Sequence, residues 1–473
     1  MKIKQSVLTI SDDNPFAEAL PGRKEIAESL SRLIESVEDP FVLAIDAGWG
    51  AGKTTFLKMW QRQLAHDASS KCIYFSAWEN DFAEDPLVSL IGELTAELAK
   101  LRLKGNPDEA AEAIIDDVKK KAGKVLQLMI PVGIKILSAG ILEAADIGLD
   151  PEVLAKASED YAKKKIEEYE ANKKTLSGFR ETLEKFAKSL RKENNDNPLI
   201  FIIDELDRCR PAYAVALLER LKHLFSVPGI CFVLAIDRLG LLASIKAQYG
   251  SELNAEGYLR RFIDLDYYLP DPEIEPFLQM LCKQFELEKL PSISDRYSMS
   301  TVLNGWPQVC RSLGLKLRDV EQCFARFVLI LRIAPQIDPM QDFVLLPFVL
   351  ALRFCEDSPL HRRLSTSLVS AEILLGFLSR TEAGKLFRKS NESAYLEVCL
   401  IAALDGEAAL KALSDRLNAL RQTGNDGDRN RTEMMINAIE EISPARFYRQ
   451  ALSTVFANIE FANGFGSVKG VAG

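Results

Sequence analysis

"FVLAIDAGWGAGKTTF", residues 41–56, decides the fold of this chain. Five apolar residues, 41–45, lead into a segment with three glycines in five positions, and a lysine and two threonines follow. An apolar run bounded by Pro40 and the glycines predicts a short buried strand, and residues 55–66 continue as a helix. Glycines at a helix N-terminus let backbone N–H groups converge on an anion, so the stretch predicts a phosphate-binding loop.

The spacing fits the P-loop pattern G-x-x-x-x-G-K-[ST], read here from Ala47 to Thr54 with Ala47 in place of the first glycine. Lys53 is predicted to pair with the β and γ phosphates of ATP, and the Thr54 hydroxyl to ligate Mg²⁺. A chance glycine-rich turn is the alternative, and the strand context and a second motif argue against it. The loop and the helix start supply these predicted nucleotide contacts: Gly48, Gly50, Ala51, Gly52, Lys53, Thr54 and Thr55.

The second motif is "LIFIIDELDR", residues 199–208, an apolar run that ends in carboxylates. Asp204 is predicted to reach the Mg²⁺ shell, and Glu205 to polarise the attacking water. Two surface carboxylates at a strand end are the alternative. A strand at 71–75 lies between the two motifs in the chain. This order, together with Glu205, favours an ATP-hydrolysing machine over a small-molecule kinase.

Near-continuous apolar strands that alternate with helices are typical of a parallel α/β sheet. The predicted strands are residues 41–46, 71–78, 199–205, 229–237 and 261–269. The predicted helices are residues 24–38, 55–66, 85–101 with Asp85 as N-cap, and 212–225. We expect a parallel-sheet P-loop NTPase core in residues 1–272, with a helical insertion at about 102–196. An all-α region follows in residues 273–473.

Composition excludes several classes of protein. Of 473 residues, 47% are hydrophobic, and the net charge is −9, so no direct nucleic-acid binding is evident. The eight cysteines form no CxxC pair and there are only three histidines, which predicts a reduced, cytoplasmic chain without a zinc site. The first twenty residues lack the apolar stretch of a signal peptide.

One apolar segment, "VLQLMIPVGIKILSAGIL" at 125–142, approaches the length of a membrane span. It contains Pro131 and Lys135, and a lysine in mid-span costs roughly 2.5–3.5 kcal/mol on insertion. We favour a buried helical hairpin or partner-docking segment, with membrane contact as the alternative.

Asp237 ends the strand "VLAID", where NTPases of this kind carry a polar sensor of the γ phosphate. It also stands where it could cap the next helix, and both roles are compatible.

Taken together, the motifs resemble the KAP family of P-loop NTPases, a group within the STAND branch of AAA+-like ATPases. The resemblance covers residues 20–272, about half the chain. Glu205 stands where many members have a second aspartate. The segments that carry the resemblance are "AGWGAGKTTF", "FSAWENDFAEDPL", "FIIDELDRCRP", "LLERLKHLF", "FVLAIDR" and "YGSELNAEGYLRRFIDLDYYLP".

The resemblance implies two further site residues. It places a basic residue at the second position of the Arg260–Arg261 pair, so Arg261 is predicted to be an arginine finger; surface salt bridges to Glu252 or Glu256 are the alternative. "GLKLRDVEQCF", residues 314–324, resembles the start of a C-terminal helical lid. Arg318 would then be a second sensor of the nucleotide, or else an ordinary surface arginine.

The resemblance also implies partner proteins, because many prokaryotic members occur in anti-phage systems. We therefore expect an ATP-binding and ATP-hydrolysing switch or remodelling ATPase with Mg²⁺, able to form a homo-oligomer. The alternatives are a nucleotide-binding scaffold with little hydrolysis and a membrane-associated signalling ATPase. The intact Asp204–Glu205 pair argues against the scaffold. Sequence chemistry does not separate ATP from GTP.

Overall fold

The structure is a computed structural model. It describes residues 10–103, 116–124, 166–189, 197–442 and 450–464, apart from short gaps at 38, 68–70, 84, 122, 168–169, 172, 223–225, 291–292, 294–295, 335–336, 356–359, 361–362, 365–368 and 424–425. The predicted hairpin at 125–142 and most of the predicted insertion at 102–196 lie outside the described residues.

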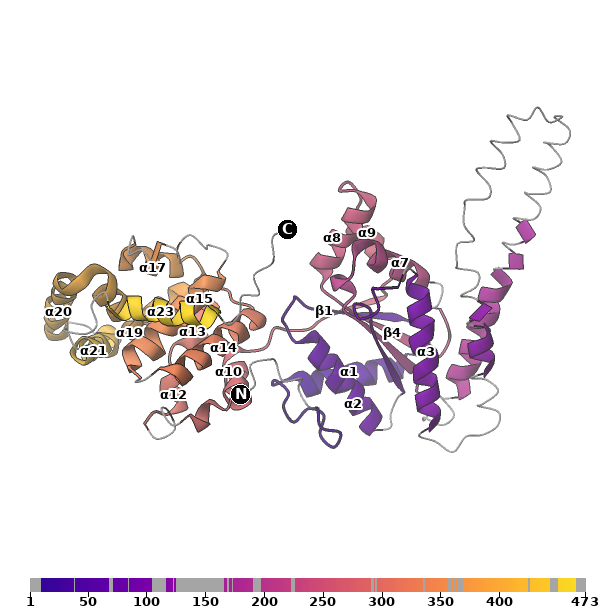
Figure 1. Ribbon diagram of the computed structural model, residues 1–473, viewed down its shortest axis with the longest axis horizontal. Coiled ribbons are helices and arrows are strands. Elements are labelled where there is room, and N and C mark those ends of the chain that lie inside the picture. Colours follow the sequence, from indigo (N-terminus) through magenta and orange to yellow (C-terminus); the bar gives the residue numbers. More distant parts are fainter. Residues whose placement is uncertain are drawn as a thin grey trace, which may run out of the picture. The chain divides into compact units, whose positions relative to one another are not determined.

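Five parallel strands form one sheet in the order β2-β3-β4-β1-β5 (Figure 1). The predicted fold class is confirmed. Strands β3 and β4 are buried along their whole length, as their unbroken apolar sequences predict. The strands are β1 (Val42–Asp46), β2 (Cys72–Ser76), β3 (Leu199–Asp204), β4 (Ile230–Ile236) and β5 (Leu265–Tyr268).

Helices cover both faces of the sheet, with α1 and α2 on one side and α3 on the other (Figure 1). The core on the α3 side joins alternate strand residues to the buried faces of α3, α7 and α8. The Leu87 N–H donates to Asp85 Oδ1 at 2.8 Å, so the predicted cap of α3 is confirmed. The helices of this part are α1 (Arg23–Ser36), α2 (Lys53–His66), α3 (Pro86–Leu103), η2 (Leu206–Arg208), α7 (Pro211–Leu221), α8 (Arg238–Tyr249) and α9 (Ala255–Leu259).

The prediction of a buried strand at 261–269 was wrong in two respects. β5 begins only at Leu265, at the edge of the sheet, and it is largely exposed. The Arg260–Arg261 pair therefore does not open the strand. It directly follows the short helix α9.

Contacts divide the described chain into two units. One holds Ile10–Gly48 and Lys53–Pro270, and the other holds Trp49–Gly52 with the residues from Asp271 onward. In the described residues from 271 onward, every regular element is a helix, and Trp306 lies 5.3 Å from the ring centre of Phe327 in their core.

These helices are α10 (Ile274–Gln284), η3 (Leu287–Lys289), α12 (Met299–Val302), α13 (Trp306–Ser312), α14 (Leu317–Ile333), η4 (Met340–Leu345), α15 (Leu346–Phe354), α17 (Ala371–Leu378), α18 (Glu382–Lys389), α19 (Glu392–Leu400), η5 (Ile401–Asp405), α20 (Gly406–Thr423), α21 (Asp426–Glu441) and α23 (Gln450–Gly464). In the part of the chain that the structure describes, no helix is both long enough and apolar enough to cross a membrane.

Candidate nucleotide site

The glycine loop joins the end of β1 to the start of α2. Gly50 and Gly52 have φ values of 87° and 82°, a left-handed conformation that glycine adopts without strain. Lys53 is the first residue of α2, and its Nζ donates to the Ala47 carbonyl oxygen at 2.5 Å. Ala47 also donates its N–H to the Ile236 carbonyl. Ala47 thus contributes backbone groups to the loop, which explains why alanine can replace the first glycine of the pattern.

Asp204 ends β3 and is fully buried. Its Oδ2 accepts a hydrogen bond from the Tyr74 hydroxyl at 2.8 Å, and its Oδ1 accepts one from the Glu205 N–H at 2.8 Å. Burial raises the pKa of the Asp204 carboxyl, and hydrogen bonds from Thr54 and Tyr74 partly oppose that rise. The structure therefore brings together Thr54 and Asp204, the two predicted Mg²⁺ ligands. It adds Tyr74, which the sequence did not indicate.

Glu205 follows at a sharp turn. Its φ of 62° is left-handed, which costs a residue with a side chain on the order of 1–3 kcal/mol and recurs at functional sites. Both carboxylate oxygens are engaged: Ser76 Oγ donates to Oε2 at 2.8 Å, and Arg208 donates to Oε1 at 2.6 Å. The predicted base is thus held by hydrogen bonds next to Asp204, with its side chain only 11% exposed.

Asp237 caps α8, because its Oδ1 accepts the Gly240 N–H at 3.2 Å. Its own N–H donates to Asp207. The capping alternative is therefore realised. Asp237 directly follows Ile236, which pairs with Asp46 at the end of β1. Its second role, as a phosphate sensor, stays a prediction.

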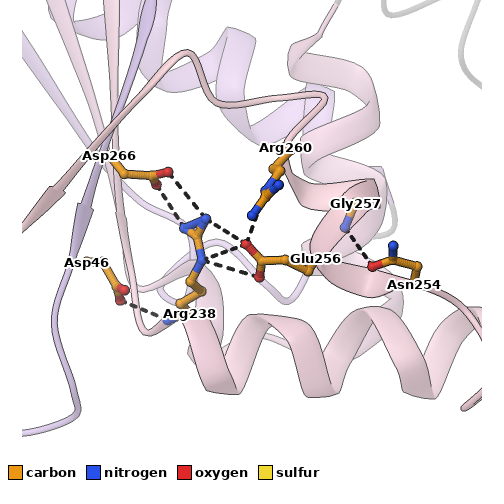
Figure 2. Close-up of polar contacts among 7 residues, drawn as sticks. All are labelled: Asp46, Arg238, Asn254, Glu256, Gly257, Arg260 and Asp266. Atoms are coloured by element: carbon orange, nitrogen blue, oxygen red, sulfur yellow. Dashed lines mark hydrogen bonds and ion pairs between the residues drawn. The ribbon is translucent and has the colours of Figure 1, made fainter.

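Arg238, the next residue, forms a network that the sequence analysis missed (Figure 2). Its N–H donates to Asp46 Oδ1 at 3.0 Å, and its guanidinium bonds Asp266 of β5 at 2.8 Å and Glu256 of α9 at 3.0 Å. Arg260 lies 3.6 Å from the same Glu256 carboxylate. Arg238 thus ties the start of α8 to β1, β5 and α9. The available signal was the arginine directly after "VLAID".

The second face of α9 is held by tyrosines. The hydroxyls of Tyr258 and Tyr249 both donate to Glu219 Oε1, at 2.7 and 2.5 Å. Arg261 is exposed, with its guanidinium carbon 6.0 Å from the centre of the Tyr258 ring. Of the two arginines, Arg260 makes the predicted ion pair to Glu256.

Arg261 lies in the turn between α9 and β5. Three residues after it, Asp264 exchanges hydrogen bonds with Val42, the first residue of β1. The glycine loop follows the opposite end of β1. The role of Arg261 as an arginine finger stays a prediction. Arg318 is the second residue of α14, in the unit that also holds Trp49–Gly52 of the glycine loop, and its role as a second sensor stays a prediction.

The donor set suits a P-loop magnesium site. A hydroxyl and a carboxylate are hard oxygen ligands, which Mg²⁺ prefers, and Mg²⁺ in such sites completes its shell with phosphates and water. Within the described ranges, no group of three or more His, Cys, Asp or Glu side chains could hold a metal ion. Thr54 and Asp204 therefore suit a metal ion whose remaining ligands come from a bound nucleotide and from water.

A parallel sheet, a glycine loop that opens a helix and a buried carboxylate beside that helix define the class: P-loop nucleotide-binding domains. Comparison with family models gives the family. Residues 23–334 match the KAP family P-loop domain, and the chain belongs to this family.

Two known proteins show a more distant likeness. The phage T7 exclusion protein of Escherichia coli (strain K12) is 23% identical over 274 residues, which are 53% of this chain and 33% of that protein. The chain thus aligns with about a third of its relative's length. The second is the structure of the Aeropyrum pernix ORC2 protein in ADPNP–ADP complexes. Its superposition covers 89% of this chain and 94% of the ORC2 chain, at 14% sequence identity and a TM-score of 0.34. At that TM-score the likeness supports no conclusion about function.

Proposed function

We propose that this protein binds ATP with Mg²⁺, hydrolyses it, and works as a molecular switch or remodelling ATPase. The observation that carries the proposal is the convergence of the loop, Thr54 and the Asp204–Glu205 pair at the carboxyl edge of the sheet. A phosphate site at a helix N-terminus alone would suit any anion. The buried carboxylates next to it suit a bound metal and an activated water.

The residues divide the work as follows. Lys53 exchanges the Ala47 carbonyl for the β and γ phosphates, which is a short movement of its flexible side chain. Thr54 and Asp204 would hold Mg²⁺, and the bound metal would neutralise negative charge on the phosphate oxygens. Glu205 accepts a proton from the attacking water. Each oxygen accepts one of the two hydrogen bonds, from Ser76 and from Arg208, so that a lone pair is left on each for a water.

A homo-oligomer completes the proposed site. Arg261 is exposed and lies just after α9, a helix that is held by the contacts of Glu256 and Tyr258. These features support a finger that stabilises the transferring γ phosphate on a second copy of the chain. Asp237 is proposed as the γ-phosphate sensor in the same chain as the loop.

The proposed domain bounds and the proposed cellular role rest on membership of the KAP family. We propose residues 1–272 as the KAP P-loop domain, with the insertion at about 102–196. Residues 273–473 would be the helical lid and sensor region, in which Arg318 meets the nucleotide. The phage T7 exclusion relative supports a place in an anti-phage system with further protein partners.

One observation favours a second candidate, a nucleotide-binding scaffold with little hydrolysis. Both oxygens of Glu205 are occupied by donors from the chain itself. These donors hold the carboxylate in place, where it serves the packing of the site as well as it would serve a water. Measured turnover of purified protein separates the two candidates, because a scaffold binds ATP with negligible phosphate release.

Lys53→Ala tests the site itself. ATP affinity should fall about 10–100-fold, because a charge-assisted hydrogen bond is worth about 1.5–3 kcal/mol. Isothermal calorimetry with ATP and Mg²⁺ measures the change. Arg62→Ala is the matched control, since it removes an exposed positive charge from the same helix α2. Unchanged affinity in Lys53→Ala would rule out the P-loop assignment.

A further inference from the structure

Strand β2 supplies one hydroxyl to each carboxylate of the proposed site. It pairs with β3 in parallel register, with Tyr74 opposite Ile202 and Ser76 opposite Asp204. Residues two apart on a strand point to the same face. Tyr74 and Ser76 therefore share a face, and their hydroxyls donate to Asp204 and Glu205 respectively, each at 2.8 Å.

The Tyr74 contact controls the orientation of a buried group. Asp204 is fully buried, and the Glu205 N–H already fixes its Oδ1. The hydrogen bond from Tyr74 to Oδ2 therefore fixes the rotation of the carboxylate about its last side-chain bond. The Tyr74 ring is itself held beneath α2, where Lys58 Nζ lies 5.6 Å from the ring centre. A hydroxyl on an aromatic ring held in this way fixes the direction of its hydrogen bond to Asp204, whereas a mobile water would not.

We infer that Tyr74 is a positioning residue for the Mg²⁺-binding carboxylate of Asp204, an inference that rests on the proposed function of this site. Tyr74 does not touch the metal or the nucleotide. It keeps one lone pair of Oδ2 engaged and leaves the other lone pairs of the carboxylate for a metal and for Thr54, which hydrogen-bonds the same side chain. Partners of this kind contribute about 10–100-fold to metal affinity.

The test uses Tyr74→Phe, which keeps the ring and removes the hydroxyl. It is made in the Glu205→Gln background, so that ATP is not consumed, and calorimetry measures ATP affinity with excess Mg²⁺ and with EDTA. We expect affinity with Mg²⁺ to fall about 10-fold and affinity in EDTA to stay unchanged. Tyr213→Phe is the matched control, because it removes a hydroxyl from a buried tyrosine elsewhere in the same domain.

A double-mutant cycle with Asp204→Asn excludes an indirect effect. If Tyr74 acts through Asp204, adding Tyr74→Phe to the Asp204→Asn protein should cause no further loss of ATP affinity with Mg²⁺. An equal loss of affinity with Mg²⁺ and with EDTA, or an unchanged affinity in both, would overturn the inference. Failure of the proposed function looks different: the Glu205→Gln parent would itself bind ATP no better with Mg²⁺ than with EDTA.

Discussion

Arg261→Ala should hydrolyse ATP about 10³–10⁵-fold more slowly than the wild type while binding ATP normally. An arginine finger stabilises charge that develops on the γ phosphate in the transition state, so its loss lowers kcat and spares ground-state binding. Phosphate release gives kcat, and calorimetry gives the affinity. Arg260→Ala is the matched control, because this neighbour pairs with Glu256 and should matter far less. Near-normal hydrolysis by Arg261→Ala would end the finger hypothesis.

A mixing experiment shows on which chain the finger acts. Arg261→Ala has an intact loop, and Lys53→Ala has an intact finger. If the finger reaches a second copy, a mixture of the two inactive proteins should recover part of the activity. The exposure of the Arg261 side chain on its own chain supports this outcome. A mixture as inactive as its components would instead assign Arg261 to the site of its own chain.

Glu205→Gln should bind ATP with near-wild-type affinity and hydrolyse it about 10²–10⁴-fold more slowly. The amide keeps the shape of the side chain and removes the base. Asp204→Asn should instead weaken the dependence on Mg²⁺, since that carboxylate serves the metal. Glu79→Gln, an exposed carboxylate just after β2, is the control. Wild-type turnover in Glu205→Gln would mean that the base lies elsewhere.

Much of the core could be predicted because its signals are local. β1, β3 and β4 are unbroken apolar runs that end at or directly before an aspartate, and each falls within a residue or two of its predicted bounds. Asp85 was recognisable as a cap from its position before an apolar helix. These features need only neighbouring residues, so a single sequence reveals them.

The residues that surround the carboxylates could not be predicted in this way. Tyr74 and Ser76 meet Asp204 and Glu205 only because β2 and β3 pair in one particular register. Well over a hundred residues separate the two strands in the chain, as the Tyr74–Asp204 spacing of 130 shows. Single-sequence periodicity contains no information on such pairing.

The error at β5 has a different cause. Alternating apolar residues in "RFIDLDYYL" suggested a strand from 261 onward. α9 is only five residues long, too short for a helical period to show. Its existence depends on the Asn254 cap, which accepts the Gly257 N–H at 2.9 Å (Figure 2), and on ion pairs from Arg238. The network around Arg238 likewise joins residues that are distant in the chain, so the sequence alone does not reveal it.

The sheet order has a consequence for biosynthesis. β1 is the first strand to leave the ribosome, yet its two neighbours are β4 and β5. The pairing of Asp46 with Ile236 spans 190 positions, and at about 5–20 residues per second the gap in translation is about 10–40 s. During that time the backbone of the strand that leads into the glycine loop has no native partner. A nascent chain therefore cannot cradle a nucleotide until nearly the whole core has been translated.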